Sequence, residues 1–199
     1  MVDLWITPLT LTGKVVRLEP LSEAHVAGLA EAGRDASIWK YMLYGDMRGE
    51  DSMTAWVQDI LSHQAQGTDL PFTVFHQASS RIIGATRYME MRPPHRSLEI
   101  GGTWYSTEFQ RTSVNTESKY LLLKYAFEGL KCIRVQFKAD ARNERSLRAI
   151  ERLGAVREGV LRNHYVLQDG TFRDSVYYSI LDREWPGVKV HLEAKLKRD

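Results

Sequence analysis

The chain has 199 residues, of which 43% are hydrophobic, and it carries 27 basic and 25 acidic side chains. This length and composition predict a single domain, spanning residues 1–199, with a full hydrophobic core. The formal net charge of +2 argues against a dedicated nucleic-acid-binding or membrane-surface protein. The single cysteine, Cys132, excludes an internal disulfide framework and is typical of a reducing compartment.

The N-terminal segment, residues 1–8, has no basic stretch followed by an apolar one, so it does not resemble a secretory signal. No apolar run approaches the ~20 residues needed to span a bilayer. We therefore expect a soluble, cytoplasmic protein without a membrane or nucleic-acid partner.

Hydrophobic periodicity and turn residues predict mixed elements in the first half of the chain. In order, they are a strand over 14–21, a helix capped by Ser22, a short helix over 37–42, a longer helix from Ser52, and strands over 71–75 and 81–89 joined by a turn at Ser79 and Ser80.

The second half begins after a break at residues 92–95, which include two prolines. Its predicted elements are a strand over 97–104, a helix over 113–128, a strand over 132–139, a helix over 144–153, a hairpin of strands over 159–167 and 171–180, and a helix over 182–197. Gly101 and Gly102 lie inside a strand, which indicates a bulge or a close approach of a ligand to the backbone. The order predicts a mixed α/β fold with a largely antiparallel sheet.

Two segments about thirty residues apart carry the main functional signal. Residues 104–117 have the pattern of a strand, a polar turn and a helix start, and unpaired N–H groups at a helix N-terminus suit a phosphate. The second segment opens a helix at Asn143, a good N-cap residue, and closes it at Gly154, a good residue just past a helix end.

Together with Glu99-Ile100-Gly101, residues 114–117, 143–146 and 154–159 resemble the GNAT superfamily of acetyl-CoA-dependent N-acetyltransferases, over nearly the whole chain. Within it, the chain looks closest to the branch of the bacterial ribosomal-protein N-terminal acetyltransferases. The resemblance implies the GNAT fold, an α/β (α+β) architecture whose mixed, largely antiparallel sheet is splayed between its fourth and fifth strands. It also implies acetyl-CoA as cosubstrate in that gap, a protein N-terminus or a small-molecule amine as acceptor, and a possible homodimer.

The segment that would hold the pyrophosphate departs from the family pattern. The family usually has Gln/Arg-x-x-Gly-x-Gly/Ala, most often with a further glycine after the first residue, whereas residues 110–115 contain no glycine. Arg111 could hold a phosphate through charge-assisted hydrogen bonds and Ser113 through its hydroxyl. Alternatively, affinity for the cofactor is weakened or lost, and the chain is a GNAT-fold binding module without turnover.

The resemblance implies a set of cofactor-binding positions, with Asn143 on the pantetheine arm and the residue three positions later near the thiol. These positions are Thr103, Trp104, Gln110, Arg111, Thr112, Ser113, Val114, Asn115, Asn143 and Ser146.

Two residues are candidates for proton transfer. Glu99, at the start of its strand, could deprotonate the acceptor amine directly or through water. It could equally be a solvated strand end. Ser146 could protonate the leaving thiolate, or it could be an ordinary first-turn residue beside the N-cap Asn143.

The remaining candidates are mostly structural. His164, Tyr165 and Tyr88 could line an acceptor pocket or simply pack in the sheet, and Cys132 is expected in a buried strand. The basic set Arg142, Arg145, Arg148 and Arg152 could flank the 3′-phosphate of CoA or form a solvated helix face balanced by Glu144 and Glu151. The six histidines show no metal-ligand spacing, so no metal is expected.

Overall fold

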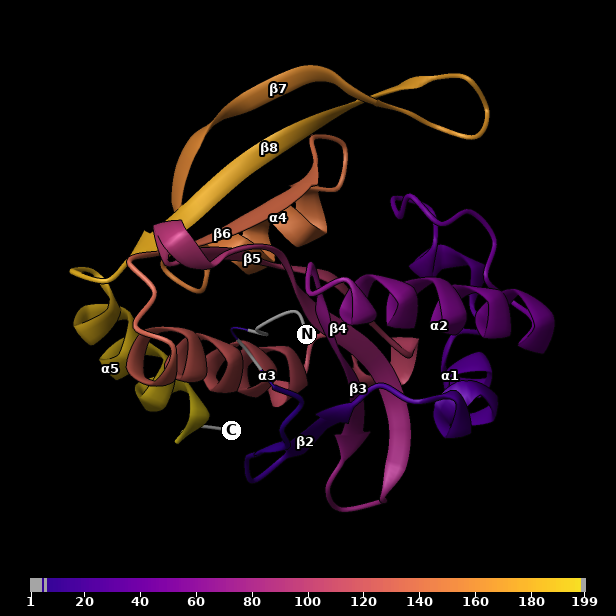
Figure 1. Ribbon diagram of the computed structural model, residues 1–199, viewed down its shortest axis with the longest axis horizontal. Coiled ribbons are helices and arrows are strands. Elements are labelled where there is room, and N and C mark those ends of the chain that lie inside the picture. Colours follow the sequence, from indigo (N-terminus) through magenta and orange to yellow (C-terminus); the bar gives the residue numbers. More distant parts are fainter. Residues whose placement is uncertain (1–4, 6, 198–199) are drawn as a thin grey trace.

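The computed structural model describes residue 5 and residues 7–197. Part of the N-terminal segment in which no secretory signal was found, residues 1–4 and 6, lies outside the described residues, as do residues 198–199. The strands form one sheet, and the helices that lie between groups of strands in the sequence flank it (Figure 1).

The strands are β1 (Leu11–Thr12), β2 (Val16–Pro20), β3 (Leu70–His76), β4 (Arg81–Arg92), β5 (Ser97–Tyr105), β6 (Arg134–Asp140), β7 (Val156–Val166) and β8 (Phe172–Leu181). The α-helices are α1 (Val26–Ala32), α2 (Glu50–Ala65), α3 (Ser113–Lys124), α4 (Glu144–Glu151) and α5 (Trp185–Leu196).

The eight strands form one sheet in the order β1-β2-β3-β4-β5-β6-β8-β7. All neighbours are antiparallel except β5 and β6, which run parallel and pair only over Ser97–Glu99 and Arg134–Gln136. Beyond Glu99 the two strands continue without pairing, so the sheet splays between them. This arrangement confirms the predicted mixed, largely antiparallel and splayed sheet.

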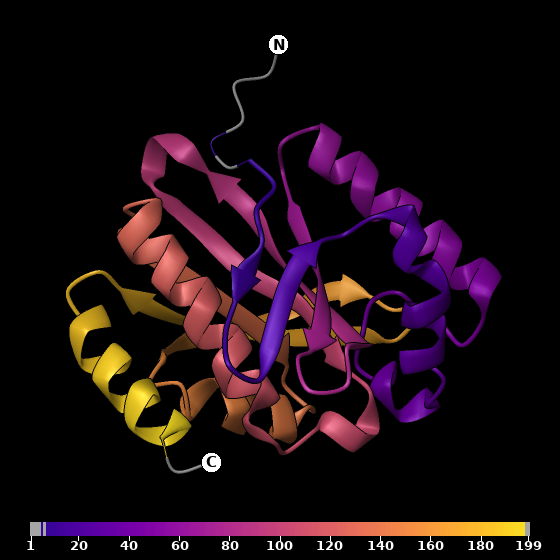
Figure 2. The same ribbon diagram turned by 90° about the horizontal axis from the view of Figure 1, so that it is seen from below.

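The sheet separates two hydrophobic clusters, because neighbouring strand residues point to opposite faces. On β4, Ile83 belongs to the cluster that includes residues of α3 and α5, whereas its neighbour Ile82 packs against the cluster that includes residues of α1 and α2. The bulge in β5 shifts this alternation by one residue: Leu98 and Ile100 belong to the cluster with α3 and α5, whereas Trp104, an even number of positions later, belongs to the other cluster. Figure 2 shows α1 and α2 on one side of the molecule and α3 and α5 on the other.

Several predicted boundaries differ from the structure. The helix expected over 37–42 is wrong, because only Ala36–Ile38 form a single 3-10 turn. That turn is held by Asp35, whose side chain accepts from the Ser37 N–H, while Trp39 Nε1 donates to the Gly33 carbonyl at 2.8 Å. These local bonds satisfy the backbone without a longer helix.

Other differences concern helix and strand ends. Ser22 makes no side-chain capping bond, and the helix expected there begins as a 3-10 turn over Glu23–His25 before α1. The helix expected over 113–128 is α-helical to Lys124 and then widens into a π-helical turn over Tyr125–Gly129. Strand β7 starts three residues before the expected Gly159, and β1 was not predicted.

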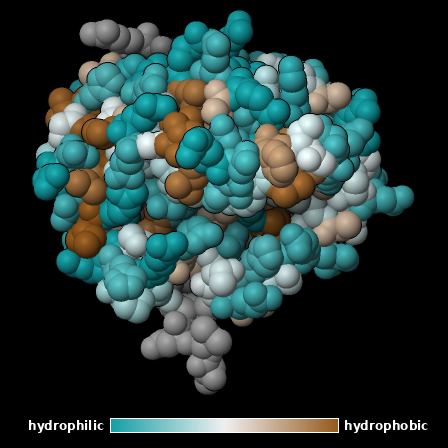
Figure 3. All heavy atoms as spheres, turned by 90° about the horizontal axis from the view of Figure 1, so that it is seen from above, coloured by the Kyte–Doolittle hydropathy of each residue, from teal (hydrophilic) through white to brown (hydrophobic). Residues whose placement is uncertain are grey.

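The last hairpin forms an edge of the sheet and exposes apolar side chains, including Val156, Leu161, Val166 and Phe172. Figure 3 looks onto the side on which β7 and β8 lie in Figure 1, and it shows scattered apolar side chains among hydrophilic ones. In the described part of the chain, no helix has the length and apolar character needed to cross a membrane.

Candidate active site

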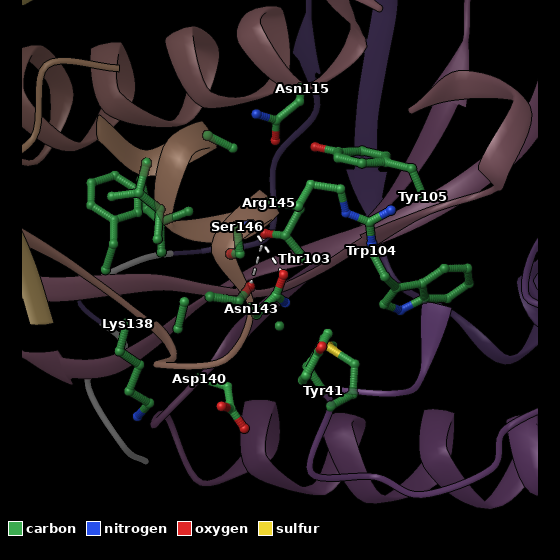
Figure 4. A pocket seen from close by; sticks show the side chains of 18 of the residues that line it. Tyr41, Thr103, Trp104, Tyr105, Asn115, Lys138, Asp140, Asn143, Arg145 and Ser146 are labelled. Atoms are coloured by element: carbon green, nitrogen blue, oxygen red, sulfur yellow. Dashed lines mark hydrogen bonds between the residues drawn. The ribbon is translucent and has the colours of Figure 1, made fainter. Parts of the chain in front are cut away.

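A cavity of about 300 Å³ lies where β5 and β6 diverge. Its walls come from β5, β6, the first half of α3, α4 and the residues just after it, the β7–β8 hairpin and the segment over residues 38–44. In Figure 4, Asn143, Ser146 and Thr103 lie near the centre of this cavity, with Asn115 and Arg145 above them and Lys138, Asp140 and Tyr41 below. The opened sheet therefore brings together residues that lie more than a hundred positions apart.

The glycine pair on β5 forms a bulge, as predicted. The β4–β5 register shifts between Ala85, which pairs with Trp104, and Arg87, which pairs with Gly101, so β5 has one extra residue there. Gly102 has a φ of +57°, and a Cβ on it would lie 2.9 Å from Arg87 Nε and 3.1 Å from the Tyr44 hydroxyl. Glycine thus allows both the left-handed backbone and the close packing behind the bulge.

The residue packed behind this bulge belongs to a buried ion pair. Arg87 NH1 lies 3.2 Å from Asp69 Oδ2, and both side chains are less than a tenth exposed. Burial raises the pKa of Asp69, and the neighbouring guanidinium opposes that rise. The pair fixes the rear wall of the cavity at the point where β5 bulges.

The turn before α3 keeps the conformation that glycine usually provides, without a glycine. Arg111 has a φ of +63°, at the position where the family most often has a glycine. A non-glycine residue in this region costs roughly 1–2 kcal/mol. Thr112 is the N-cap of α3, and its hydroxyl accepts from the Val114 N–H at 3.3 Å. The Arg111 side chain is exposed and lines the cavity.

Gln110 ties this turn to its surroundings. Its Nε2 donates to the Tyr105 carbonyl at 2.9 Å, and its Oε1 accepts from a guanidinium nitrogen of Arg145 on α4. The second bond connects the two helix N-termini that flank the cavity. Arg145, one of the basic residues of α4, therefore has a specific partner in this turn.

Asn143 caps α4, as predicted, because its Oδ1 accepts from the Ser146 N–H at 3.1 Å. This bond leaves the amide Nδ2 of Asn143 as a donor. Asn143 and Ser146 both line the cavity, and Ser146 is half-buried. The positions suit contact with a bound molecule, and the assignment of Ser146 as an acid stays a prediction.

Glu99 is buried rather than a solvated strand end, with 1% of its surface exposed. Its Oε2 accepts from Gln136 Nε2 at 2.9 Å and lies 3.3 Å from Lys138 Nζ, and both of these partners are on β6. Burial raises the pKa of Glu99, whereas Lys138 and Gln136 oppose the rise. A carboxylate with a raised pKa inside a cavity has the properties of a general base.

Lys119 on α3 was missed by the sequence reasoning. Its ammonium group is buried, hydrogen bonds to the hydroxyl of Thr103 and lies 3.4 Å from that of Thr86. Burial lowers the pKa of Lys119 to about 7, with Glu99 opposing the shift. One signal was available in the sequence: Lys119 lies four positions after Asn115 and three before Leu122, on one helix face.

The side of the cavity away from α3 is covered by the hairpin and by the segment over residues 38–44. Gln168, in the hairpin turn, donates to the Tyr44 carbonyl at 3.3 Å, and Arg173 on β8 donates to the Tyr41 carbonyl at 3.5 Å. Lys138 and Arg173 each approach the Tyr165 ring to 5.6 Å. Tyr165, Lys138 and Arg173 all line the cavity, and the last two were not identified from sequence.

The predicted site residues divide into two groups. Those that line the cavity are Glu99, Thr103, Trp104, Gln110, Arg111, Asn115, Asn143 and Ser146, whereas Thr112, Ser113 and Val114 are in the adjoining helix start and do not line it. The Trp104 side chain packs on Trp39 and Trp56, with ring centroids 4.9 and 6.3 Å away. Its side chain therefore belongs to the core, and only its backbone is placed to meet a ligand.

The alternative candidates have mostly structural positions. Tyr88 is fully buried and donates to the Leu122 carbonyl, and Cys132 is buried, which raises its pKa to about 12. His164 lies against Tyr165 and Tyr177 in the hairpin rather than in the cavity wall.

The basic set on α4 and before it also divides. Arg142 pairs with Asp140, and Arg148 pairs with Glu144 on the exposed face, as expected for a solvated surface. Arg145 and Arg152 instead line the cavity. Within the described residues, no three His, Cys, Asp or Glu side chains form a group that could hold a metal ion.

Comparison with known proteins agrees with this geometry. Residues 16–156, more than half of the chain, match the family described as "Acetyltransferase (GNAT) domain". A Bacillus subtilis (strain 168) protein named "Putative ribosomal N-acetyltransferase YdaF" is 40% identical over 95 residues, which are 48% of this chain and 51% of that protein. The chain thus matches about half the length of this relative.

Solved structures match over nearly the whole chain. A structure described as a "putative acetyltransferase from T. thermophilus" has 40% identity and a TM-score of 0.88, covering 96% of this chain and 99% of that one. A GCN5-related N-acetyltransferase from Brucella melitensis has 27% identity and a TM-score of 0.89, with 95% and 86% covered.

The chain therefore belongs to the GNAT acetyltransferase family, whose members are N-acetyltransferases that use acetyl-CoA. Its resemblance to the ribosomal-protein acetyltransferase branch is supported by the name of its Bacillus subtilis relative.

Proposed function

We propose that this protein transfers the acetyl group of acetyl-CoA to a primary amine by direct attack in a ternary complex. The observation that carries the proposal is the cavity itself. It opens where β5 and β6 stop pairing, and it is bordered by a β5 bulge, by the N-termini of α3 and α4, and by the buried Glu99. Holding an amine and a thioester together in such a space supplies much of the rate of a transfer reaction.

The cofactor side of the proposal rests on the turn and the two helices. Gln110, Arg111, Asn115, Asn143 and Ser146 line the cavity from there. Thr112, Ser113 and Val114 form the start of α3, whose N-terminus favours an anion such as a pyrophosphate. The left-handed conformation of Arg111 supports cofactor binding over the alternative of a binding module without turnover, because the turn keeps the shape that a glycine would give it.

In the proposed reaction, Glu99 takes a proton from the acceptor ammonium, directly or through water, and the free amine attacks the thioester carbon. The N–C bond forms first and gives a tetrahedral species, whose collapse breaks the C–S bond. The second proton that leaves the nitrogen replaces, through water, the proton that Ser146 gives to the thiolate. Backbone N–H groups near Thr103 and Trp104 are the proposed donors to the carbonyl oxygen as it gains negative charge. Ser146 is the proposed donor of a proton to the departing thiolate.

The relative YdaF is named as a ribosomal N-acetyltransferase, so we propose a protein N-terminus as the first acceptor to test and small-molecule amines as the second. The test combines two measurements on the purified protein. Calorimetric titration with acetyl-CoA is expected to give micromolar binding, and thiol release is then measured against a panel of N-terminal peptides and small amines.

Three outcomes of this test are distinct. Binding with release of thiol on at least one amine supports the proposal. Binding without turnover on any amine favours the binding module instead. Lack of binding at millimolar acetyl-CoA contradicts both the cofactor site and the proposed transfer.

A further inference from the structure

The wall of the cavity away from α3 contains a buried guanidinium. Arg173 is 6% exposed, although it lies on β8 of the last hairpin. Its Nε donates to the Ser175 hydroxyl at 3.2 Å, and one terminal nitrogen donates to the Tyr41 carbonyl at 3.5 Å. These neutral acceptors orient the side chain without compensating its charge.

The carboxylates nearest to this guanidinium already have other partners. Asp140 receives two bonds from the Arg142 side chain, at 3.0 and 2.8 Å, and Glu99 pairs with Lys138 and Gln136. In the described part of the chain, no Asp or Glu oxygen lies within 4.0 Å of the Arg173 nitrogens. A buried charge without a close opposite charge is costly. Burial accordingly lowers the pKa of Arg173.

The cavity as a whole has an excess of positive charge. Its lining includes two acidic side chains, Glu99 and Asp140. Besides Arg87, which pairs with Asp69, and Lys119, whose pKa is about 7, it includes five basic side chains, which are Arg111, Lys138, Arg145, Arg152 and Arg173. Arg111 and Arg145 belong to the turn and helix assigned to the cofactor phosphates. Arg173 lies instead across the cavity, beside Lys138 and Tyr165.

We propose that the acceptor amine carries a carboxylate group and that Arg173 binds this carboxylate inside the cavity. This inference rests on the proposed function, because it concerns the acceptor of the same reaction. A guanidinium fork matches a planar carboxylate through two parallel hydrogen bonds. Glu99 on β5 lines the same cavity and would then face the amine, so the carboxylate and the amine of the acceptor would be bound by two different strands. Two sources share this chemistry: a free amino acid, and a peptide whose first residue is acidic.

The test measures binding of product-like ligands, so it does not depend on turnover. N-acetyl-leucine and its uncharged counterpart N-acetyl-leucinamide are titrated calorimetrically into the full chain in the presence of CoA. A third ligand, an N-acetyl-aspartyl peptide with an amidated C-terminus, carries its carboxylate on the side chain alone. We expect at least one of the carboxylates to bind tenfold or more tightly than the leucinamide.

Arg173→Gln is expected to abolish this preference, and Arg173→Lys to keep part of it. Arg162→Gln is the matched control, because Arg162 is an exposed arginine of the same hairpin that does not line the cavity. Preference for N-acetyl-leucine assigns a free amino acid, and preference for the aspartyl peptide assigns a protein N-terminus.

Equal affinity of the wild-type protein for acids and amide overturns the inference, even if the Arg173 variants do not fold. So do an unchanged preference in a folded Arg173→Gln variant and failure of all three ligands to bind. The proposed function is tested separately from this inference. Carboxylate-selective binding without acetyl transfer would contradict the transfer reaction but not the carboxylate subsite at Arg173. Transfer to neutral amines without such selectivity would contradict the subsite alone.

Discussion

Glu99 on β5 and Lys138 on β6 form a buried ion pair, with Oε2 and Nζ 3.3 Å apart, just where the two strands stop pairing. The pair connects the two strands at the inner end of the gap between them, and both residues line the cavity. The Lys138 ammonium group opposes the rise that burial causes in the pKa of Glu99, the proposed general base. The behaviour of this pair with pH is therefore the most direct probe of the proposed chemistry.

Replacing Glu99 by Gln should lower kcat/KM about 100-fold or more, the usual contribution of a general base. For the wild-type enzyme, activity should fall as the pH drops through the raised pKa of Glu99, because the protonated carboxyl cannot accept a proton. Lys138→Met should move this acidic limb to higher pH, since the lysine opposes the rise. Initial rates of thiol release from pH 5 to 9 measure both effects. Glu108→Gln, which changes an exposed carboxylate paired with Arg81, is the control, and a profile unchanged in Glu99→Gln would exclude the base role.

Lys119 should make the stability of the protein depend on pH. Its pKa is about 7 in the folded state and 10.5 in the reference state. Between these values unfolding takes up a proton, so the lysine lowers stability as the pH falls from 10.5 to 7, and its effect is constant below 7. Relative to Lys119→Met, the free energy of unfolding of the wild-type protein should rise with pH by up to about 1.4 kcal/mol per unit. Urea unfolding at several pH values measures the difference, and parallel curves would contradict the shifted pKa.

Arg111 combines a left-handed backbone with a charged side chain at the proposed phosphate site. If its charge holds the phosphates, Arg111→Gly and Arg111→Ala should both weaken acetyl-CoA binding, by roughly tenfold for one charge-assisted hydrogen bond. If only the backbone shape matters, both variants should keep their affinity, because alanine has the same backbone preference as arginine and glycine adopts the left-handed conformation more readily. Calorimetry at two salt concentrations distinguishes these cases, because the charge-based loss should shrink at high salt. Unchanged affinity in both variants would contradict a role of the Arg111 side chain in binding the phosphates.

Glu117 should be important for stability rather than for catalysis. Its carboxylate accepts from the backbone N–H groups of Lys14, Val15 and Val16 at 2.7–2.8 Å, which ties α3 to the start of β2. Hydrogen bonds to a charged group contribute about 1.5–3 kcal/mol each. Glu117→Gln converts one acceptor oxygen into a donor, so it should lower the free energy of unfolding by about 2 kcal/mol or more.

The same contact explains Gly13, where a Cβ would lie 2.4 Å from the Glu117 carboxyl carbon. Gly13→Ala should lower the free energy of unfolding by about 1–3 kcal/mol, as overpacking usually does. Gly159→Ala is the matched control, because a Cβ there would have no atom within 4 Å. Chemical denaturation of the wild-type protein and of the Glu117→Gln, Gly13→Ala and Gly159→Ala variants gives the comparison. A Glu117→Gln variant as stable as the wild type would contradict the role of Glu117, and equal stability of the two alanine variants would show that Gly13 is not constrained.

The sequence by itself determined the local features of this protein. Hydrophobic periodicity and turn residues located most helices and strands. Asn143 was identified as an N-cap, and two adjacent glycines indicated the β5 bulge. Each of these features depends only on residues that are neighbours in the sequence. The family, and with it the splayed sheet, followed from motifs spread along the chain.

Only the tertiary structure decided the chemistry of the cavity walls. Lys119, Lys138 and Arg173 come from a helix and two strands that only the folded chain brings to one cavity, and in sequence each resembles an ordinary surface cation. Their burial, and the pairing of Glu99 with Lys138, depend on contacts that no local pattern encodes. Proton affinity and unpaired charge arise from desolvation and from distances to other groups, and both exist only in the folded chain.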